Sequence, residues 1–295
     1  MIETVLDKDK DYITQFLSRD PELSLADARF CVTKSDTVIV YKNQLSEVVG
    51  CGTFRLWGKE KNKADVYIYV APESRGTGVG RKLFEYLLKA PQNIGLKFFS
   101  TKIETNHASS LDFFSKMGFE KWYTELIIFH DTERQPENNL EFIKYRTEYF
   151  KQYVDTIRRS FYDLRSSNDF QPYYCCEPDE SKYNELEQNK DNIYILLDGD
   201  KIVASVTVKV NSIEDVFVSP DYQGKGIGKK MMHFAINKAI ELGSSQIELS
   251  AIEWNKRALQ LYRRVGFKNG KTIYYMRLFD LSCKNKSELD KTVGH

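Results

Sequence analysis

The sequence contains one glycine-rich segment twice, and this duplication limits the folds that the chain can adopt. Residues 70–81 (VAPESRGTGVGR) align without a gap with residues 218–229 (VSPDYQGKGIGK), 148 positions further on. The same spacing places Phe114 on Tyr262. Solenoid repeats are about 20 to 50 residues long, so a repeat of this length indicates a duplicated domain. A chain of 295 residues has room for two domains of ordinary size.

The duplication sets the expected domain boundaries. We expect a first domain at residues 1–130, a linker at 131–139, a second domain at 140–279 and a polar tail at 280–295. The linker segment is polar and contains Pro136, which is typical of a connection between domains. Within each copy, predicted short strands and helices follow one another in the same order.

The second glycine-rich segment has the pattern of a phosphate-binding loop. Residues 213–218 are mostly β-branched or aromatic and precede Pro220, which favours a buried strand that ends there. Residues 229–242 carry an apolar stripe at helical spacing and are followed by Gly243. Three glycines between strand and helix let the backbone present N–H groups to an anion at the positive end of the helix.

Two familiar phosphate loops do not fit this segment. A Walker loop needs a glycine directly before Lys-Ser/Thr, whereas here Lys229 is followed by Lys230 and Met231. A dinucleotide fingerprint needs its third glycine at position 229, but Gly228 comes one residue too early. A protein that binds ATP or NAD therefore remains an alternative that the spacing disfavours.

Composition and charge exclude several classes of partner. The formal net charge is +1, and the 29% of charged residues include both signs, so we expect neither a nucleic-acid surface nor a polybasic membrane patch. The N-terminal residues lack a basic region with an apolar core, and no apolar run approaches about 18 residues. We therefore expect a soluble, cytoplasmic protein. The five cysteines form no C-x-x-C pair, so neither disulfides nor a metal site is expected.

A second motif follows the strand predicted at residues 246–251. Asn255 is placed to cap the helix that begins at Lys256, Tyr262 lies seven residues on and on the same face, and Gly266 is placed to end the helix. Taken alone, these residues are a helix cap, a core aromatic and a stop signal. Their spacing after the glycine loop makes a functional role the better interpretation.

Together the two motifs resemble those of the GCN5-related N-acetyltransferases. Residues 223–228 (QGKGIG) resemble motif A of that family, and residues 255–267 resemble motif B, N-x-x-A-x-x-x-Y-x-x-x-G-F. The resemblance implies two tandem domains of the α/β (α+β) class, each with a mixed, mostly antiparallel sheet flanked by helices. It also implies an acetyltransferase that uses acetyl-CoA and transfers acetyl to a primary amine by direct attack in a ternary complex.

The resemblance assigns roles to residues of the second copy. Tyr262 would protonate the leaving thiolate, Asn255 would hold the pantetheine arm, and a backbone N–H near Val218 would polarise the thioester carbonyl. The loop amides would hold the pyrophosphate. The expected cofactor-binding residues are Val216, Phe217, Val218, Gln223, Gly224, Lys225, Gly226, Ile227, Gly228, Lys229 and Asn255.

An attacking ammonium must first lose its proton, so a base is needed. Glu214 and Asp215 lie on the strand before the loop, and some family members use a glutamate on this strand. Because side chains of a strand alternate between faces, we expect only one of the two to face the substrate. We assign Glu214 as the catalytic base, with Glu253 in reserve.

The first copy departs from the family pattern at the residues that carry chemistry. His107 takes the place of Asn255, and Phe114, which cannot donate a proton, takes the place of Tyr262. We expect this copy to bind the cofactor or support the fold without efficient transfer. Its loop is intact, and the residues of this possible second cofactor site are Val70, Arg75, Gly76, Thr77, Gly78, Val79, Gly80 and Arg81.

The sequence leaves the acceptor open. The expected partner is a small-molecule or peptide amine, with no nucleic acid and no membrane, and the chain is a monomer or a homodimer. A non-enzymatic module that binds acyl-CoA and signals through another protein is the main alternative. It predicts tight cofactor binding without release of thiol.

Overall fold

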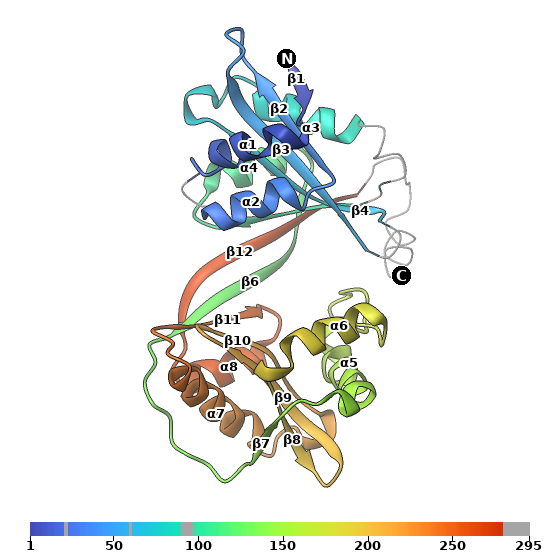
Figure 1. Ribbon diagram of the computed structural model, residues 1–295, viewed down its shortest axis with the longest axis vertical. Helices are drawn as coiled ribbons and strands as arrows, with labels where there is room; N and C mark the ends of the chain where they lie inside the picture. Colours follow the sequence, from blue (N-terminus) through green and yellow to red (C-terminus); the bar gives the residue numbers. More distant parts are fainter. Residues whose placement is uncertain (21–22, 59–60, 90–95, 97, 280–295) are drawn as a thin grey trace. The chain divides into compact units, whose positions relative to one another are not determined.

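The computed structural model describes residues 1–20, 23–58, 61–89, 96 and 98–279 (Figure 1). The chain divides into two compact units. Unit 1 comprises Met1–Trp122 with residues 275–279, and unit 2 comprises Tyr123–Tyr274. The domain boundaries at 1–130, 131–139 and 140–279 remain predictions from the repeat. The polar tail predicted at 280–295 lies outside the described residues.

Unit 1 contains a sheet with helices on it. The sheet order is β1-β2-β3-β4-β5, followed by the end of β12; β4 and β5 are parallel, and the pairs from β1 to β4 are antiparallel. Its elements are β1 (Ile2–Thr4), α1 (Lys10–Leu17), α2 (Leu25–Thr33), β2 (Thr37–Lys42), β3 (Val48–Trp57), β4 (Lys63–Val70), α3 (Val79–Lys89), β5 (Phe98–Glu104) and α4 (Ala108–Lys116).

Unit 2 repeats this plan. Its sheet order is β12-β6-β11-β10-β9-β8-β7, in which β10 and β11 are parallel. Its elements are β6 (Glu120–His130), β7 (Phe142–Lys144), α5 (Phe150–Ser166), α6 (Glu180–Asn189), β8 (Ile193–Asp198), β9 (Lys201–Lys209), β10 (Ser212–Val218), α7 (Ile227–Glu241), β11 (Ile247–Ile252), α8 (Lys256–Arg264) and β12 (Lys268–Phe279). The predicted class, two domains with mixed, mostly antiparallel sheets and flanking helices, is confirmed.

The last strands of the two sequence copies do not stay with their own copy. Most of β6, which ends the first copy, belongs to unit 2, where it pairs with β11 from Ile247↔His130 to Ile252↔Glu125. The end of β12, which closes the second copy, belongs to unit 1. The segment at 131–139 has no helix or strand. It is held to α7 by two hydrogen bonds between Gln135 and Asn237, of 2.8 and 2.9 Å.

Two hydrophobic clusters cover the two faces of the unit 2 sheet. Alternate residues of β8 divide between them: Tyr194 packs with the α7 side, whereas Ile195 packs with α5 and α6. On the α7 side, the predicted apolar stripe is buried at Met231, Met232, Ala235, Ile236 and Ala239. Burial of this stripe fixes where α7 begins and therefore where its N-terminus points. No helix in the described part of the chain is long and apolar enough to cross a membrane.

Candidate functional site

Strand β10 departs from regular geometry in the middle of the unit 2 sheet. Its register against β9 shifts between Glu214 and Phe217, and Asp215 has a φ of +47°, in the left-handed region. Its parallel pairing with β11 is at Ser212 and Glu248, near the beginning of the strand. A bulge of this kind bends a strand and interrupts its pairing. The structure accordingly has a cavity between the diverging strands.

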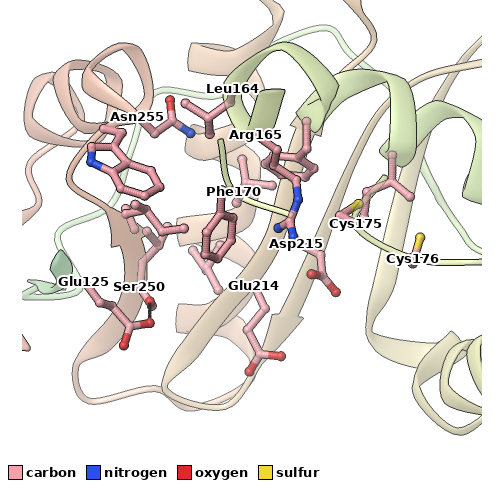
Figure 2. A pocket seen from close by; sticks show the side chains of 18 of the residues that line it. Glu125, Leu164, Arg165, Phe170, Cys175, Cys176, Glu214, Asp215, Ser250 and Asn255 are labelled. Atoms are coloured by element: carbon pink, nitrogen blue, oxygen red, sulfur yellow. Dashed lines mark hydrogen bonds between the residues drawn. The ribbon is translucent and has the colours of Figure 1, made fainter. Parts of the chain in front are cut away.

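The cavity brings together the residues on which the predicted chemistry depends. It has a volume of about 380 Å³, and its walls come from β10, β11, α5, the loop after α5 and α8, with one residue each from β6 and α6. Glu214, Val216, Asn255 and Tyr262 line it, together with Asp215. Figure 2 labels Glu214, Asp215 and Asn255 in its wall. The reserve base of the sequence prediction, Glu253, is not one of its lining residues.

Tyr262 is a protonated phenol in the wall of this cavity. Its side chain is only 6% exposed, and burial raises its pKa above the ordinary value. The ring packs against Phe267, with centroids 6.0 Å apart. Because burial disfavours the phenolate, the hydroxyl holds its proton at neutral pH and can give it to a stronger base.

Asn255 caps α8, as the sequence predicts. Its Oδ1 accepts a hydrogen bond from the backbone N–H of Ala258 at 3.1 Å. The cap uses only the amide oxygen, so the Nδ2 group keeps its hydrogen atoms for another acceptor. Asn255 therefore combines a structural contact with a donor at the cavity.

The two carboxylates of β10 both line the cavity, because the bulge interrupts the alternation that would turn one of them away. Glu214 accepts from Lys209 Nζ at 2.7 Å and from Ser212 Oγ at 2.8 Å. Asp215 is accessible from the cavity, yet the surrounding protein limits its hydration, and this raises its pKa above the ordinary value, against the opposing charge of Lys182. The carboxyl of Asp215 is thus held in surroundings that favour its protonated form.

The glycine loop lies beyond the cavity, at the N-terminus of α7. Gly224 and Gly226 have φ values of +78° and +80°, and nothing lies within 4 Å of where a Cβ would stand. The loop backbone is therefore open to a ligand at the positive end of a helix, which fits a diphosphate. Gln223 fastens the loop: its Nε2 donates to the carbonyl oxygen of Val218 (3.0 Å), and its Oε1 accepts from Arg257 (2.7 Å).

The other predicted binding residues take different positions around the loop. Phe217 points into the core, where its ring lies 5.4 Å from that of Tyr153, so only its backbone is available to a ligand. Gly228 packs against α8, since an added Cβ would lie 3.2 Å from Leu261. Lys225 is exposed, with Nζ 4.8 Å from the centroid of the Tyr222 ring. Lys229 is also exposed, and Ile227 is half-buried.

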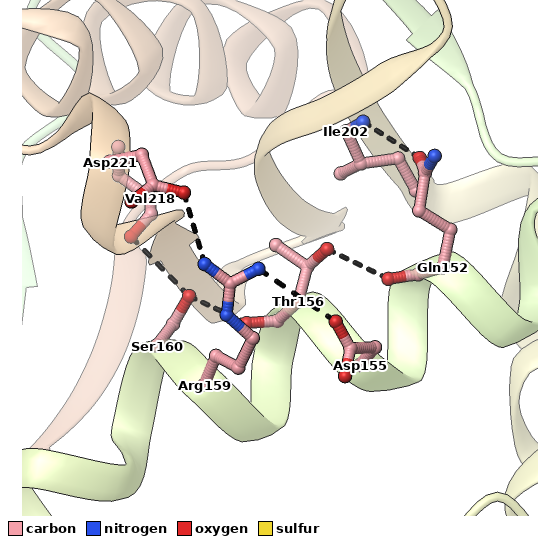
Figure 3. Close-up of polar contacts among 8 residues, drawn as sticks. All are labelled: Gln152, Asp155, Thr156, Arg159, Ser160, Ile202, Val218 and Asp221. Carbon is pink, nitrogen blue, oxygen red and sulfur yellow. Dashed lines mark hydrogen bonds and ion pairs between the residues drawn. The ribbon is translucent and has the colours of Figure 1, made fainter.

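Helix α5 is fastened to the strand end that leads into the loop (Figure 3). Ser160 Oγ donates to the carbonyl oxygen of Val218 (3.4 Å), and Arg159 pairs with Asp221 (3.0 Å) just before the loop. At the other end of the helix, Gln152 Oε1 accepts from the backbone N–H of Ile202 (2.7 Å). These contacts fix one wall of the cavity relative to β10.

Unit 1 has its cavity at the glycine loop. It measures about 720 Å³, and Asn106, His107 and Phe114 line it. Of the predicted second cofactor site, Thr77 turns its hydroxyl to the carbonyl oxygen of Ser74 (2.6 Å). The other residues of that site all line the cavity: Val70, Arg75, Gly76, Gly78, Val79, Gly80 and Arg81.

The strand before this loop is regular. β4 pairs with β3 in one unbroken register from Trp57↔Lys63 to Gly50↔Val70. Val66 and Tyr67 stand where unit 2 has Glu214 and Asp215, and Tyr67 donates its hydroxyl to Asp20 Oδ2 at 2.7 Å. Unit 1 therefore has a loop like that of unit 2, but its strand lacks the bulge and the two carboxylates.

Comparisons with known families agree with this geometry. Residues 158–267 match the acetyltransferase (GNAT) family, and residues 33–121 match the acetyltransferase (GNAT) domain. The two matches together span more than half of the chain. The chain belongs to the GCN5-related N-acetyltransferase (GNAT) superfamily. It carries two GNAT domains, as the duplicated loop predicts.

Relatives of this GNAT protein match it over short segments. The thialysine N-ε-acetyltransferase of Bos taurus is 43% identical over 54 residues, which are 18% of this chain and 32% of the relative. The chain thus matches about a third of that relative's length.

Solved structures match the GNAT chain over nearly its whole length. A GCN5-related N-acetyltransferase from Sphaerobacter thermophilus has a TM-score of 0.71 at 15% identity, with 95% of both chains covered. A tandem GNAT protein from the clavulanic acid biosynthesis pathway has a TM-score of 0.65 at 13% identity, covering 95% of this chain and 98% of its own. At such identities the likeness is one of fold.

Sequence reasoning missed the part of the GNAT cavity that comes from outside the two motifs. Arg165, Phe170 and the adjacent thiols of Cys175 and Cys176 line the cavity from α5 and the loop that follows it, and Trp254 lines it from the turn between β11 and α8. No spacing rule connects these residues to β10. The available signal in the sequence was an arginine at the end of α5, Arg165, followed closely by an aromatic residue, Phe170.

Proposed function

We propose that the chain is an acetyl-CoA-dependent N-acetyltransferase that acetylates a primary amine in the cavity of unit 2. The observation that carries this proposal is the meeting of a buried phenol, Tyr262, and two carboxylates, Glu214 and Asp215, in one cavity at the bulge of β10. Direct transfer in a ternary complex needs a proton acceptor for the amine and a proton donor for the leaving thiolate. Both lie in this cavity.

The donor side would be held by the glycine loop and α8. Acetyl-CoA, when bound, supplies an activated acetyl thioester. The backbone N–H groups of residues 224–229 would hold its diphosphate at the N-terminus of α7, and Asn255 Nδ2 would donate to the pantetheine arm. The backbone of Val216, Phe217 and Val218 would run beside that arm, with an N–H near Val218 directed at the carbonyl oxygen.

The proton transfers are assigned to the cavity walls. Tyr262 Oη would give its proton to the leaving sulfur. Glu214 is the base that the sequence suggests, but its carboxylate is already engaged by Lys209 and Ser212. Asp215 has the raised pKa, which makes a carboxylate a better proton acceptor near neutral pH. We therefore favour Asp215 as the base and keep Glu214 as the competing assignment.

The acceptor would be a small primary amine rather than a folded protein. A cavity of about 380 Å³ accommodates a small molecule or the side chain of a peptide. The name of the Bos taurus relative specifies acetylation of the ε-nitrogen of a lysine analogue. That name supports a primary amine at the end of an alkyl chain as the group to test first.

Unit 1 favours a different role for its own loop. Its 720 Å³ cavity contains two arginines, Arg75 and Arg81, beside a glycine loop, and Phe114 stands at the position of the phenol. We propose that this unit binds coenzyme A without transferring acetyl. Calorimetric titration of the whole chain with coenzyme A then gives two sites per chain, one of which is lost in Arg75→Ala/Arg81→Ala.

Thiol release in the presence of acetyl-CoA and a panel of amines and peptides tests the enzymatic proposal. We expect turnover with at least one small primary amine and a large loss in Tyr262→Phe. Tight cofactor binding without thiol release across the panel would instead support the alternative, a regulatory module that binds acyl-CoA.

A further inference from the structure

Arg165 is a half-buried cation of the unit 2 cavity that makes no ion pair among the described residues. It lies in the last turn of α5, its Nε donates to the carbonyl oxygen of Pro172 (2.6 Å), and its Cζ lies 4.4 Å from the centroid of the Phe170 ring. Burial lowers its pKa, and the groups that oppose this lowering are two thiols and a phenol rather than a carboxylate. The guanidinium is thus partly desolvated without an opposite charge.

A second arginine of α5 differs from Arg165 in having an acidic partner. Arg158 also places its Cζ 4.4 Å from a ring, that of Tyr174, but its Nη2 lies 3.6 Å from a carboxylate oxygen of Glu177. Arg158 does not line the cavity. The two arginines share the aromatic contact and differ in the counter-charge. Of these two arginines, the one that lines the cavity is thus the one without an acidic partner.

The cavity also offers the opposite charge, on another wall. Asp215 lines it from β10 but forms no ion pair with Arg165. Lys182, the other basic residue of the lining, is already paired with Glu185 at 2.6 Å. Among the residues that the structure describes, Arg165 is therefore the one lining cation that forms no ion pair with a carboxylate. Figure 2 shows Arg165 on α5 and Asp215 on β10, with no ion pair drawn between them.

Apolar surface completes the cavity. The rings of Phe170 and Trp254 contact each other in an edge-on arrangement, with centroids 5.7 Å apart. They provide a wall for an alkyl chain. A ligand with two opposite charges and a short apolar chain between them matches this distribution of groups.

We propose that Arg165 binds a carboxylate of the acceptor, so that the acceptor is an amine of the amino-acid class rather than a simple diamine. This inference rests on the proposed function of unit 2. The planar guanidinium presents paired N–H donors that match a carboxylate, and a partly desolvated charge without a partner is stabilised by one. The ammonium of the same molecule lies toward Asp215, where its proton is removed.

Matched acceptors that differ only by a carboxylate test the inference. We compare L-ornithine with putrescine and L-lysine with cadaverine, measuring kcat/KM by thiol release. In the wild-type chain the amino acid of each pair is the better acceptor by at least about tenfold. Arg165→Gln lowers kcat/KM for the amino acids about 10- to 100-fold, the range for a hydrogen bond to a charged group, and leaves the diamines within about twofold.

Two control variants separate binding from folding. Arg165→Lys retains the charge and recovers part of the preference, whereas Arg158→Gln, on the same helix but outside the cavity, leaves the ratio within each pair unchanged. Equal or better turnover of the diamines by the wild-type chain would overturn the inference. So would an Arg165→Gln chain that loses activity toward both members of a pair equally.

A binding measurement keeps this test separate from the test of the enzyme. Calorimetric titration of the chain, saturated with coenzyme A, with each of the four acceptors requires no turnover. If no acceptor releases thiol but the amino acids bind more tightly than the diamines, and only in the presence of Arg165, the carboxylate site stands and the proposed transfer fails. If the amines are acetylated and the titrations show no preference, the carboxylate site fails and the transfer stands.

Discussion

The two units share a glycine loop but differ in the strand that leads to it. In unit 1, β4 keeps one register with β3 along its length, and Val66 and Tyr67 occupy the positions of the carboxylates. In unit 2, β10 bulges between Glu214 and Phe217 and is paired with β11 near its beginning. The loop conformation is therefore independent of whether the strand before it is regular.

This difference indicates what a glycine loop alone provides. The left-handed glycines recur in both units, with φ of +76° and +83° at Gly76 and Gly78 and of +78° and +80° at Gly224 and Gly226. Both loops thus have the backbone conformation that we propose for binding a diphosphate. Only unit 2 adds the bulge, the carboxylates and the phenol, so transfer is expected there alone.

The largest effect is expected from giving unit 2 the residue that unit 1 already has. Tyr262→Phe removes the proton donor while keeping the ring, so kcat falls about 10²- to 10⁴-fold and affinity for coenzyme A is retained. The reciprocal variant, Phe114→Tyr, adds a phenol to a unit that has Val66 and Tyr67 at the positions of the two carboxylates, and it leaves turnover unchanged. Steady-state thiol release with a fixed amine measures both. Full activity of Tyr262→Phe would remove the asymmetry between the units.

Removing the carboxylates one at a time sharpens the assignment of the base. Asp215→Asn should lower kcat/KM about 10²-fold, whereas Glu214→Gln should change it about threefold or less. If Glu214 is the base, the order of the two variants reverses.

The pH profile gives an independent reading of the same group. A base acts only when deprotonated, so the rate falls as pH drops through its pKa. Limited hydration in the surrounding protein raises the pKa of Asp215, and the fall therefore begins at a higher pH than an ordinary aspartate would give. Asp215→Asn should remove this acidic limb from the profile of kcat/KM, and persistence of the limb would point to another group.

The loops themselves allow a matched test. A Cβ at Gly226 or Gly78 meets nothing within 4 Å, so alanine at either position introduces only the strain of a left-handed backbone, about 1–2 kcal/mol. Coenzyme A affinity should fall about 5- to 30-fold at the loop that is changed and stay constant at the other. Calorimetry resolves the two sites. If only one of the two substitutions lowers the affinity for coenzyme A, the other loop binds none.

The smallest expected effect is on stability: Asp215→Asn should lower activity but increase the stability of the fold at neutral pH. A carboxyl whose pKa is raised by folding binds its proton more tightly in the folded state, so stability decreases as pH rises through the window between its unfolded and folded pKa values. An asparagine side chain carries no charge, and asparagine tolerates the φ of +47° that Asp215 adopts. Asp215→Asn should therefore raise Tm at pH 7, and the gain should shrink as pH falls toward the ordinary aspartate pKa of about 3.9 and be absent below it.

Much of this arrangement could be predicted from the sequence because it is local. The cap at Asn255, the strand before the loop and the apolar face of α7 each follow from the spacing of a few residues. The duplication gave the two domains for the same reason, since a gapless offset requires no knowledge of contacts.

The remainder depends on contacts between distant segments. Nothing in the alternation of β10 announces the bulge at Asp215, which is what lets both carboxylates reach the cavity. Arg165 and Phe170 come from the end of α5 and the loop after it, whose path is set by packing within unit 2. The repeat also does not reveal that most of β6 belongs to unit 2 and the end of β12 to unit 1. A sequence repeat shows which segments are alike, but not which unit each strand joins.

A crystal structure of the whole chain with bound acetyl-CoA tests the central claim most directly. The account predicts the diphosphate on the backbone of residues 224–229 and the thioester sulfur within hydrogen-bonding distance of Tyr262 Oη. A structure in which unit 2 holds no cofactor, or in which the sulfur lies away from that hydroxyl, would contradict it.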